Sequence, residues 1–185
     1  LAAGCHQEVG RAYTNWYGGL IGTPRISEGE RLFLEAQKFC EDHEVASYGN
    51  CLIATRVEAL EFTGRWSDAL RVGRSYLETN TVSPNNWMHF TLGLGRVGLR
   101  RGEPGVDSDI ARAVELAEGT AEPQWLVMFR LLEAEQHWVA GRSVQAATAV
   151  ESALGWAAQM GADGDFLGMA HVWARRLAVP APEPL

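Results

Sequence analysis

The chain has 185 residues, the length of one domain or of a short repeat array. Its hydrophobic share of 46% and charged share of 21% are typical of a globular protein and exclude disorder as the main state. No apolar run is long enough for a membrane span, and the first residues lack the features of a signal peptide. The net charge of −7 would repel a phosphate backbone, so we expect no direct binding of nucleic acid and no membrane association.

Cysteine usage indicates a reducing compartment. Cys5, Cys40 and Cys51 are odd in number and form no CxxC pair, which excludes a disulfide framework and a thiolate zinc site. We therefore expect a cytoplasmic protein whose cysteines are free and act as small core residues.

Helical periodicity is strong along the chain, and strand signals are weak. Trp66, Ala69, Leu70, Gly73 and Leu77, for example, fall on one face of a helix. The sequence predicts about nine helices, at 5–21, 27–43, 46–63, 66–79, 84–101, 108–118, 123–141, 143–160 and 165–177.

Local signals mark several of the predicted helix ends. Ser27 with Glu30 has the spacing of a capping box, and Ser143 is a predicted cap. Pro84 suits the first turn of a helix. Trp138, just before a glycine, is expected to close a helix hairpin by packing against it.

Glycines end the long helices at a similar spacing. Gly22, Gly64, Gly102 and Gly141 lie roughly 40 residues apart, and a short turn then opens the next helix. Such a period, with two helices per unit, is typical of a helical solenoid. We therefore expect one all-α domain over 1–178, built as a superhelical array of antiparallel helix hairpins. Its predicted repeats are 5–43, 46–79, 84–118 and 123–160, followed by a terminal helix at 165–177 and a proline-rich tail or linker at 179–185.

An ordered set of segments resembles a known repeat family. The segments are GRAYTN (10–15), FCEDHEVASY (39–48), GRWSDAL (64–70), LGLGRVGLRRGEPG (92–105), ELAEGTAEPQWL (115–126), EAEQHWVAGR (133–142) and FLGMAHVWARRL (166–177). With them the chain resembles the tetratricopeptide repeat (TPR) in a degenerate form. More narrowly, it resembles the helical-repeat region of actinobacterial LuxR-type and related ATPase-linked transcriptional regulators.

The resemblance implies a non-enzymatic module of a larger bacterial transcriptional regulator, which binds a protein or peptide or senses a ligand. A stand-alone TPR-like scaffold without an output domain is the alternative. These residues contain neither a P-loop nor a helix-turn-helix, so nucleotide hydrolysis and DNA binding would lie outside them. The expected partner is a protein or peptide, with a small-molecule effector as the alternative. A homodimer through the terminal helices is a further prediction.

In TPR-like arrays the first helix of each hairpin lines a concave groove. Carried over to this sequence, the candidate groove residues are Glu58, Glu61, His89, Arg96 and Glu135. Their carboxylates would favour basic or amine-bearing partners, and Arg96 could clamp a carboxylate end. They could also be solvated faces of amphipathic helices. If they line a groove, charge reversal at Glu58 and Glu135 should leave the fold intact and weaken partner binding.

Aromatic residues near the chain start are further candidates for a binding pocket. Tyr13, Trp16 and Tyr17 lie on an end helix, which has fewer neighbours to cover it.

No arrangement typical of an enzyme emerges from the sequence. The histidines form no HExxH, and there is no GxSxG nucleophile elbow. Gly93, Gly95 and Gly98 spell GxGxxG, but inside a helical segment, where small residues for helix–helix contact explain them better than a dinucleotide site. Val57 holds the mid-helix position that Gly95 and Ala134 keep small in the other repeats, which predicts looser or rotated packing there. We expect no enzyme activity, metal or cofactor.

Overall fold

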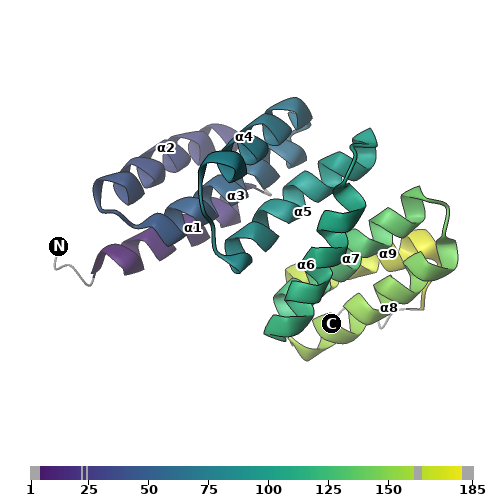
Figure 1. Cartoon of the computed structure of the whole chain (residues 1–185). Coiled ribbons are helices and arrows are strands. Elements are labelled where there is room, and N and C mark those ends of the chain that lie inside the picture. Colours follow the sequence, from purple (N-terminus) through teal and green to yellow (C-terminus); the bar gives the residue numbers. More distant parts are fainter. Residues whose placement is uncertain (1–4, 22, 24, 161–163, 181–185) are drawn as a thin grey trace. The chain divides into compact units, whose positions relative to one another are not determined.

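The chain is all-α, as the sequence predicts. A computed structural model describes residues 5–21, 23, 25–160 and 164–180, and within these ranges it contains helices and no strand (Figure 1). The helices are α1 (Cys5–Ile21), α2 (Ile26–Asp42), α3 (Ala46–Phe62), α4 (Trp66–Thr79), α5 (Pro84–Arg101), α6 (Val106–Thr120), α7 (Pro123–Val139), α8 (Ser143–Gln159) and α9 (Gly164–Leu177). None of these described helices is both long and apolar enough to cross a bilayer.

The helices group into two compact units, Leu1–Val97 and Gly98–Leu185. In the first unit, α1 packs on α2 and α3, α2 on α3, and α3 on α4. In the second, α6 packs on α7, α7 on α8 and α9, and α8 on α9. Contacts between chain neighbours, combined with contacts between the first helices of successive hairpins, are the pattern of a helical-repeat array. The single domain over 1–178 stays a prediction.

One type of turn ends most of the hairpin helices. Gly64, Gly102 and Gly141 all have left-handed φ angles, of 75°, 67° and 73°. The next residue in each case donates its backbone N–H to a carbonyl five residues earlier, at 2.8, 2.9 and 2.8 Å. This is the Schellman motif, in which a left-handed residue satisfies the last carbonyls of a helix. The predicted turns at these three glycines are therefore confirmed.

Two turns of the same kind lack a glycine. Glu44 and Ala178 both have φ of 54°, and Val45 and Val179 donate to carbonyls five residues back. Val179 is buried in the second unit, so the predicted tail begins inside the packed core. The expected turn at Gly22 and the rest of the tail, 181–185, lie outside the described residues.

The predicted serine caps are wrong, although the helices begin within about two residues of the expected positions. Arg25 is the N-cap of α2 and Arg142 is the N-cap of α8, and neither helix has a side-chain cap hydrogen bond. Ser27 therefore lies inside the first turn of α2, and Ser143 is the first residue of α8. Pro84 does open α5, as expected, and the Ser83 hydroxyl accepts the Asn86 N–H at 3.2 Å.

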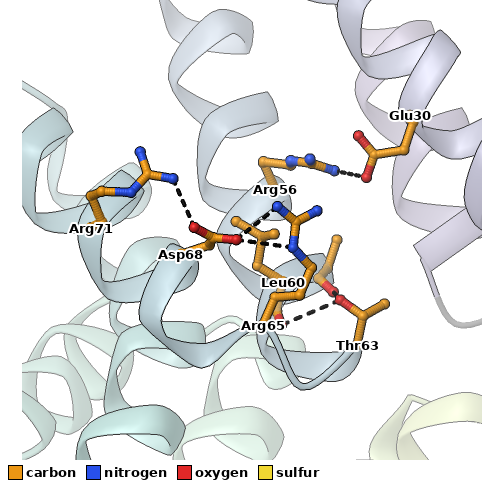
Figure 2. A network of polar contacts seen from close by, with 8 residues as sticks. Glu30, Arg56, Leu60, Thr63, Arg65, Asp68 and Arg71 are labelled. Atoms are coloured by element: carbon orange, nitrogen blue, oxygen red, sulfur yellow. Dashed lines mark hydrogen bonds and ion pairs between the residues drawn. The ribbon is translucent and has the colours of Figure 1, made fainter.

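Arginine–carboxylate pairs occupy the helix starts instead. Figure 2 shows Asp68, in the first turn of α4, held by Arg65 at 2.7 Å and by Arg71 at 2.8 Å. In the same view Arg56 of α3 pairs with Glu30 of α2. Glu30 is thus used to join two helices and does not form the expected capping box.

Trp138 does not close its hairpin as predicted, since 45% of its surface is exposed. Its ring meets Trp173 of α9 edge-on, with centroids 6.0 Å apart. The Arg176 guanidinium lies over both rings, at 5.0 and 4.9 Å. Cation–π contact therefore replaces burial at this position.

At Gly93 the backbone of α5 lies close to the backbone of α3. A Cβ built on Gly93 would lie 3.0 Å from Val57 Cγ1, 3.2 Å from the Glu58 backbone nitrogen and 3.3 Å from its Cα. Val57 itself is fully buried. The packing at Val57 is therefore tight, which corrects the expectation of looseness, and the small residue that permits it is Gly93. Gly98 in the second unit is similar, since a Cβ built on it would lie 2.9 Å from Val106 Cγ2.

We predict that Gly93→Ala destabilises the first unit by about 1–3 kcal/mol, because the added methyl meets backbone that cannot rotate away. Gly18→Ala is the matched control, since a Cβ on Gly18 of α1 meets nothing within 4 Å. That change should stabilise the helix by roughly 0.5–1 kcal/mol. Urea unfolding of both variants measures the difference. Equal effects would show that the close approach at Gly93 carries no strain.

Candidate functional site

Four of the predicted groove residues meet where α3 faces α5. His89 Nε2 donates to Glu58 Oε1 at 2.6 Å. Arg96 Nη1 lies 3.7 Å from Glu58 Oε2 and 3.8 Å from Glu61 Oε2. We call Glu58, Glu61, His89 and Arg96 the α3–α5 charge cluster. Two helices far apart in the sequence thus bring two carboxylates, an imidazole and a guanidinium together.

Helical spacing and Gly93 together place this cluster. Glu58 and Glu61 are three residues apart, so they share one face of α3. His89 and Arg96 are two turns apart on α5, and Gly93 lies between them on the same side. Because Gly93 has no side chain, the α5 backbone approaches α3 at Glu58 itself. The charged groups on either side of Gly93 are thereby brought within reach of each other.

The cluster is largely removed from water. The exposed fractions of the side chains are 17% for Glu58, 16% for His89, 21% for Arg96 and 9% for Glu61. Burial alone would raise the pKa of Glu58, but the His89 hydrogen bond and the charges of His89 and Arg96 outweigh it, so the pKa lies below its ordinary value. Charges buried this far are stable only as pairs.

His89 is correspondingly held in its protonated form. Burial would lower its pKa, but hydrogen bonds to Cys51 and Glu58 and the negative charge of Glu58 raise it to about 10. At neutral pH the ring is therefore an imidazolium that donates through both nitrogens.

Cys51 joins the cluster, although the sequence interpretation placed it among the inert cysteines. Its Sγ lies 3.4 Å from His89 Nδ1, while the other ring nitrogen faces Glu58. Cys51 and Glu58 are about two helical turns apart on α3, which puts both on the face that meets His89. That spacing is visible in the sequence, but the partner histidine on α5 is not.

Glu135, the fifth predicted groove residue, forms a separate ion pair in the second unit. Its side chain is 9% exposed, and Oε1 accepts from Arg100 Nε at 2.7 Å. Arg100 lies in the last turn of α5. The pair is thus an independent contact between the end of α5 and α7.

The three aromatic candidates of α1 do not share one surface. Tyr13 donates its hydroxyl to Glu35 at 2.7 Å and packs on Phe39. Trp16 is 55% exposed, whereas Tyr17 is 1% exposed, and burial raises its pKa. The cavity beside Tyr17 holds about 30 Å³, which is room for a water molecule and not for a ligand.

Two larger cavities were not anticipated. One, of about 350 Å³, lies in the first unit between the end of α2, the start of α3 and the end of α4. It is lined by Gln37, Cys40, Glu41, Glu44, Val45, Ala46, Gly49, Asn50, Ile53, Tyr76, Asn80 and Thr81. Half of the acidic FCEDHEVASY segment therefore borders this cavity, and the acidic composition of the segment was the signal that the sequence offered. The other, of about 480 Å³, lies between α7 and α8 in the second unit.

The burial of Glu58 and Glu135 changes what their substitution should do. Both carboxylates are paired with a cation inside a helix–helix contact, and neither is a solvated groove residue. Reversing either charge would bury two like charges side by side, so a loss of stability is expected in addition to any effect on binding. Charge reversal at these two positions therefore does not separate a loss of binding from a loss of stability.

No family model, curated protein or solved structure matches this chain. Among the residues that the structure describes, no group of three or more His, Cys, Asp or Glu could hold a metal ion. Instead, the His89 imidazole lies between the Cys51 sulfur and the Glu58 carboxylate, and we call these three residues the relay.

Because of the cluster, we expect the free energy of unfolding to fall as the pH rises into the alkaline range. His89 has a folded pKa of about 10 against an ordinary value of 6.5, so its contribution is complete below pH 6.5 and is lost as the pH rises to 10. We predict that the difference in unfolding free energy between wild type and His89→Gln shrinks by roughly 2 kcal/mol or more across that range. Urea unfolding at a series of pH values measures it.

The control for this prediction is His43→Gln, because His43 is exposed and lies outside the cluster. Its difference from wild type over the same range gives the baseline for the loss of a histidine outside the cluster. A difference for His89→Gln that stays constant from pH 6.5 to 10 would contradict a protonated His89.

Proposed function

We propose that this chain is a non-enzymatic, TPR-like helical-repeat module that binds a protein or peptide partner. We further propose that it serves as the sensing region of a larger transcriptional regulator of the LuxR-type class. Support for this comes from the resemblance of the ordered segments and from the repeated hairpin-and-turn pattern. The alternative proposal is a free-standing scaffold with the same binding role and no output domain.

The observation that carries the binding proposal is the position of Arg96. Its guanidinium stands at ion-pair distance from Glu58 and Glu61, at 3.7 and 3.8 Å, both beyond hydrogen-bond range. The planar donors of arginine are suited to bidentate contact with a carboxylate. With about a fifth of the side chain exposed, Arg96 can reach such a group from a partner.

The rest of the cluster favours an acidic group on the partner. His89 is occupied by Glu58 and Cys51, and Glu58 is occupied by His89. A basic partner would have to compete with buried, well-formed pairs, whereas a partner carboxylate would complete the contacts of Arg96. We therefore propose a peptide whose recognition centres on an acidic side chain or a free C-terminus.

Replacing Arg96 tests this. Peptides would first be selected from a random displayed library on the wild-type chain, and their affinity would then be measured by calorimetry. We predict that Arg96→Ala weakens binding at least tenfold, about 1.4 kcal/mol. Amidating or neutralising the acidic group of the peptide should weaken binding to wild type equally, and should have little further effect on Arg96→Ala.

Arg31→Ala is the matched control, since Arg31 is an exposed arginine of α2 in the same unit. It should bind as wild type does. Thermal unfolding of each variant verifies that the fold is retained. Selected peptides that bind Arg96→Ala with wild-type affinity would remove Arg96 from the site.

A small effector is a second candidate because of the 350 Å³ cavity. Its size falls within the range of ligand pockets, and it combines apolar Val45 and Ile53 with the carboxylates of Glu41 and Glu44. That lining suits a compact amine with an apolar body. Ligand binding that survives Arg96→Ala but is lost when Ile53→Trp fills the cavity would favour this candidate.

The reading frame through Leu1 and Leu185 separates the regulator from the scaffold. Continuation into a P-loop ATPase upstream or a helix-turn-helix downstream would support the regulator. A frame that holds neither would favour the scaffold.

A further inference from the structure

Cys51 of α3 is a nucleophilic group that the proposed binding role does not use. Its Sγ lies 3.4 Å from His89 Nδ1, and His89 Nε2 lies 2.6 Å from Glu58 Oε1. A nucleophile, an imidazolium and a carboxylate that orients the ring thus stand in a row. This is the arrangement that activates a side chain for covalent chemistry.

The relay is held by packing on both sides of it. Cys51 and Glu58 project from the same face of α3, and the Thr55 hydroxyl between them donates to the Cys51 carbonyl at 2.9 Å. His89 comes from α5, one turn before the close approach at Gly93. Because Gly93 allows the two helices to lie close together, the imidazole is within reach of the thiol.

The charge of His89 bears on the reactivity of the Cys51 sulfur, which lies 3.4 Å from Nδ1. An imidazolium that points a proton toward sulfur stabilises negative charge on that sulfur during nucleophilic attack. The thiolate is the reactive form of cysteine, and a cationic neighbour is the usual reason why one cysteine reacts before others. Glu58, itself held by Arg96, keeps the ring oriented and charged.

The other two cysteines provide a comparison within the same chain. Cys5 is exposed near the start of α1. Cys40 is buried, and burial together with the charge of Glu41 raises the pKa of its thiol. Cys51 is half-buried and is in contact with an imidazolium. Accessibility alone would make Cys5 the most reactive, whereas the relay favours Cys51.

We propose that Cys51 is a covalent modification site for soft electrophiles of the α,β-unsaturated carbonyl class. In the reaction the Cys51 thiol gives its proton to solvent, because His89 is already protonated, and the sulfur lone pair forms a bond to the β-carbon. The C=C π electrons move to the α-carbon, which takes a proton from the imidazolium, and the ring regains a proton from solvent. An S–H bond and a π bond are broken, an S–C bond and a C–H bond are formed, and no oxidant or leaving group is needed. This proposal does not depend on the regulator or peptide-binding roles.

Competition between the cysteines of the native chain tests the proposal. The chain is treated with limiting N-ethylmaleimide at pH 6.5, and peptide mass spectrometry follows the modification of each cysteine with time. We expect Cys51 to react at least tenfold faster than Cys5, although it is less exposed. In His89→Gln the rate at Cys51 should fall below that of Cys5, while the rate at Cys5 stays unchanged.

Glu58→Gln tests whether Cys51 reacts because His89 activates it or only because it is exposed. It keeps the size of the side chain but removes the charge that holds the imidazolium, so the rate at Cys51 should fall between wild type and His89→Gln. Circular dichroism of each variant confirms that it is folded. The wild-type ratio alone decides the proposal if a variant unfolds: a rate at Cys51 equal to or below that of Cys5 overturns it, as does an unchanged rate in folded His89→Gln.

Discussion

Gly93 has no side chain, and this absence lets the backbone of α5 lie against Val57 and Glu58 of α3. The consequence is electrostatic as well as steric. At this separation His89 and Arg96 reach the carboxylates of Glu58 and Glu61, and the Cys51 sulfur reaches the imidazole. A wider spacing would admit water, weaken each pair and leave the thiol without its neighbour. The packing of one glycine therefore determines the chemistry of the candidate site.

Buried ion pairs are rarely the most stable way to join two helices, since hydrophobic side chains of similar size often serve as well or better. The first unit nevertheless carries a charge cluster at the contact of α3 with α5, and the second carries Arg100–Glu135 between α5 and α7. Such pairs fix register, because a shifted helix would leave charges unpaired. In the first unit they also hold the guanidinium of Arg96 where a partner can reach it. We interpret the cluster as serving positioning and recognition more than stability.

The sequence predicted the helices well because their ends carry strong signals. The bounds of α1, α4 and α5 were anticipated to the residue, and the turns at Gly64, Gly102 and Gly141 followed from glycine alone. The turn at Glu44 was not predictable as a left-handed turn, since a residue with a Cβ adopts that conformation only under tertiary constraint. The serine caps were wrong because Arg25 and Arg142 hold the N-cap positions.

The sequence predicts which site residues share a face of one helix, but not which residues of two different helices meet. The spacings of Glu58 with Glu61 and of His89 with Arg96 follow from helical geometry, so each pair was expected on one face. Which residue of α5 meets which residue of α3 depends on the register at Gly93, and for that reason Cys51 was not recognised. The cavity at the end of α2 depends on three helices meeting, which periodicity does not encode.

The protonation of His89 tests the central claim most directly. Nitrogen-15 chemical shifts of the ring, followed by NMR from pH 6 to 10, report each ring nitrogen separately. The account predicts an imidazolium with protons on both Nδ1 and Nε2 through pH 8, titrating near pH 10. A ring that loses its proton near the ordinary value of 6.5 would contradict the account, because the imidazolium that pairs with Glu58 and faces Cys51 would then be absent at neutral pH.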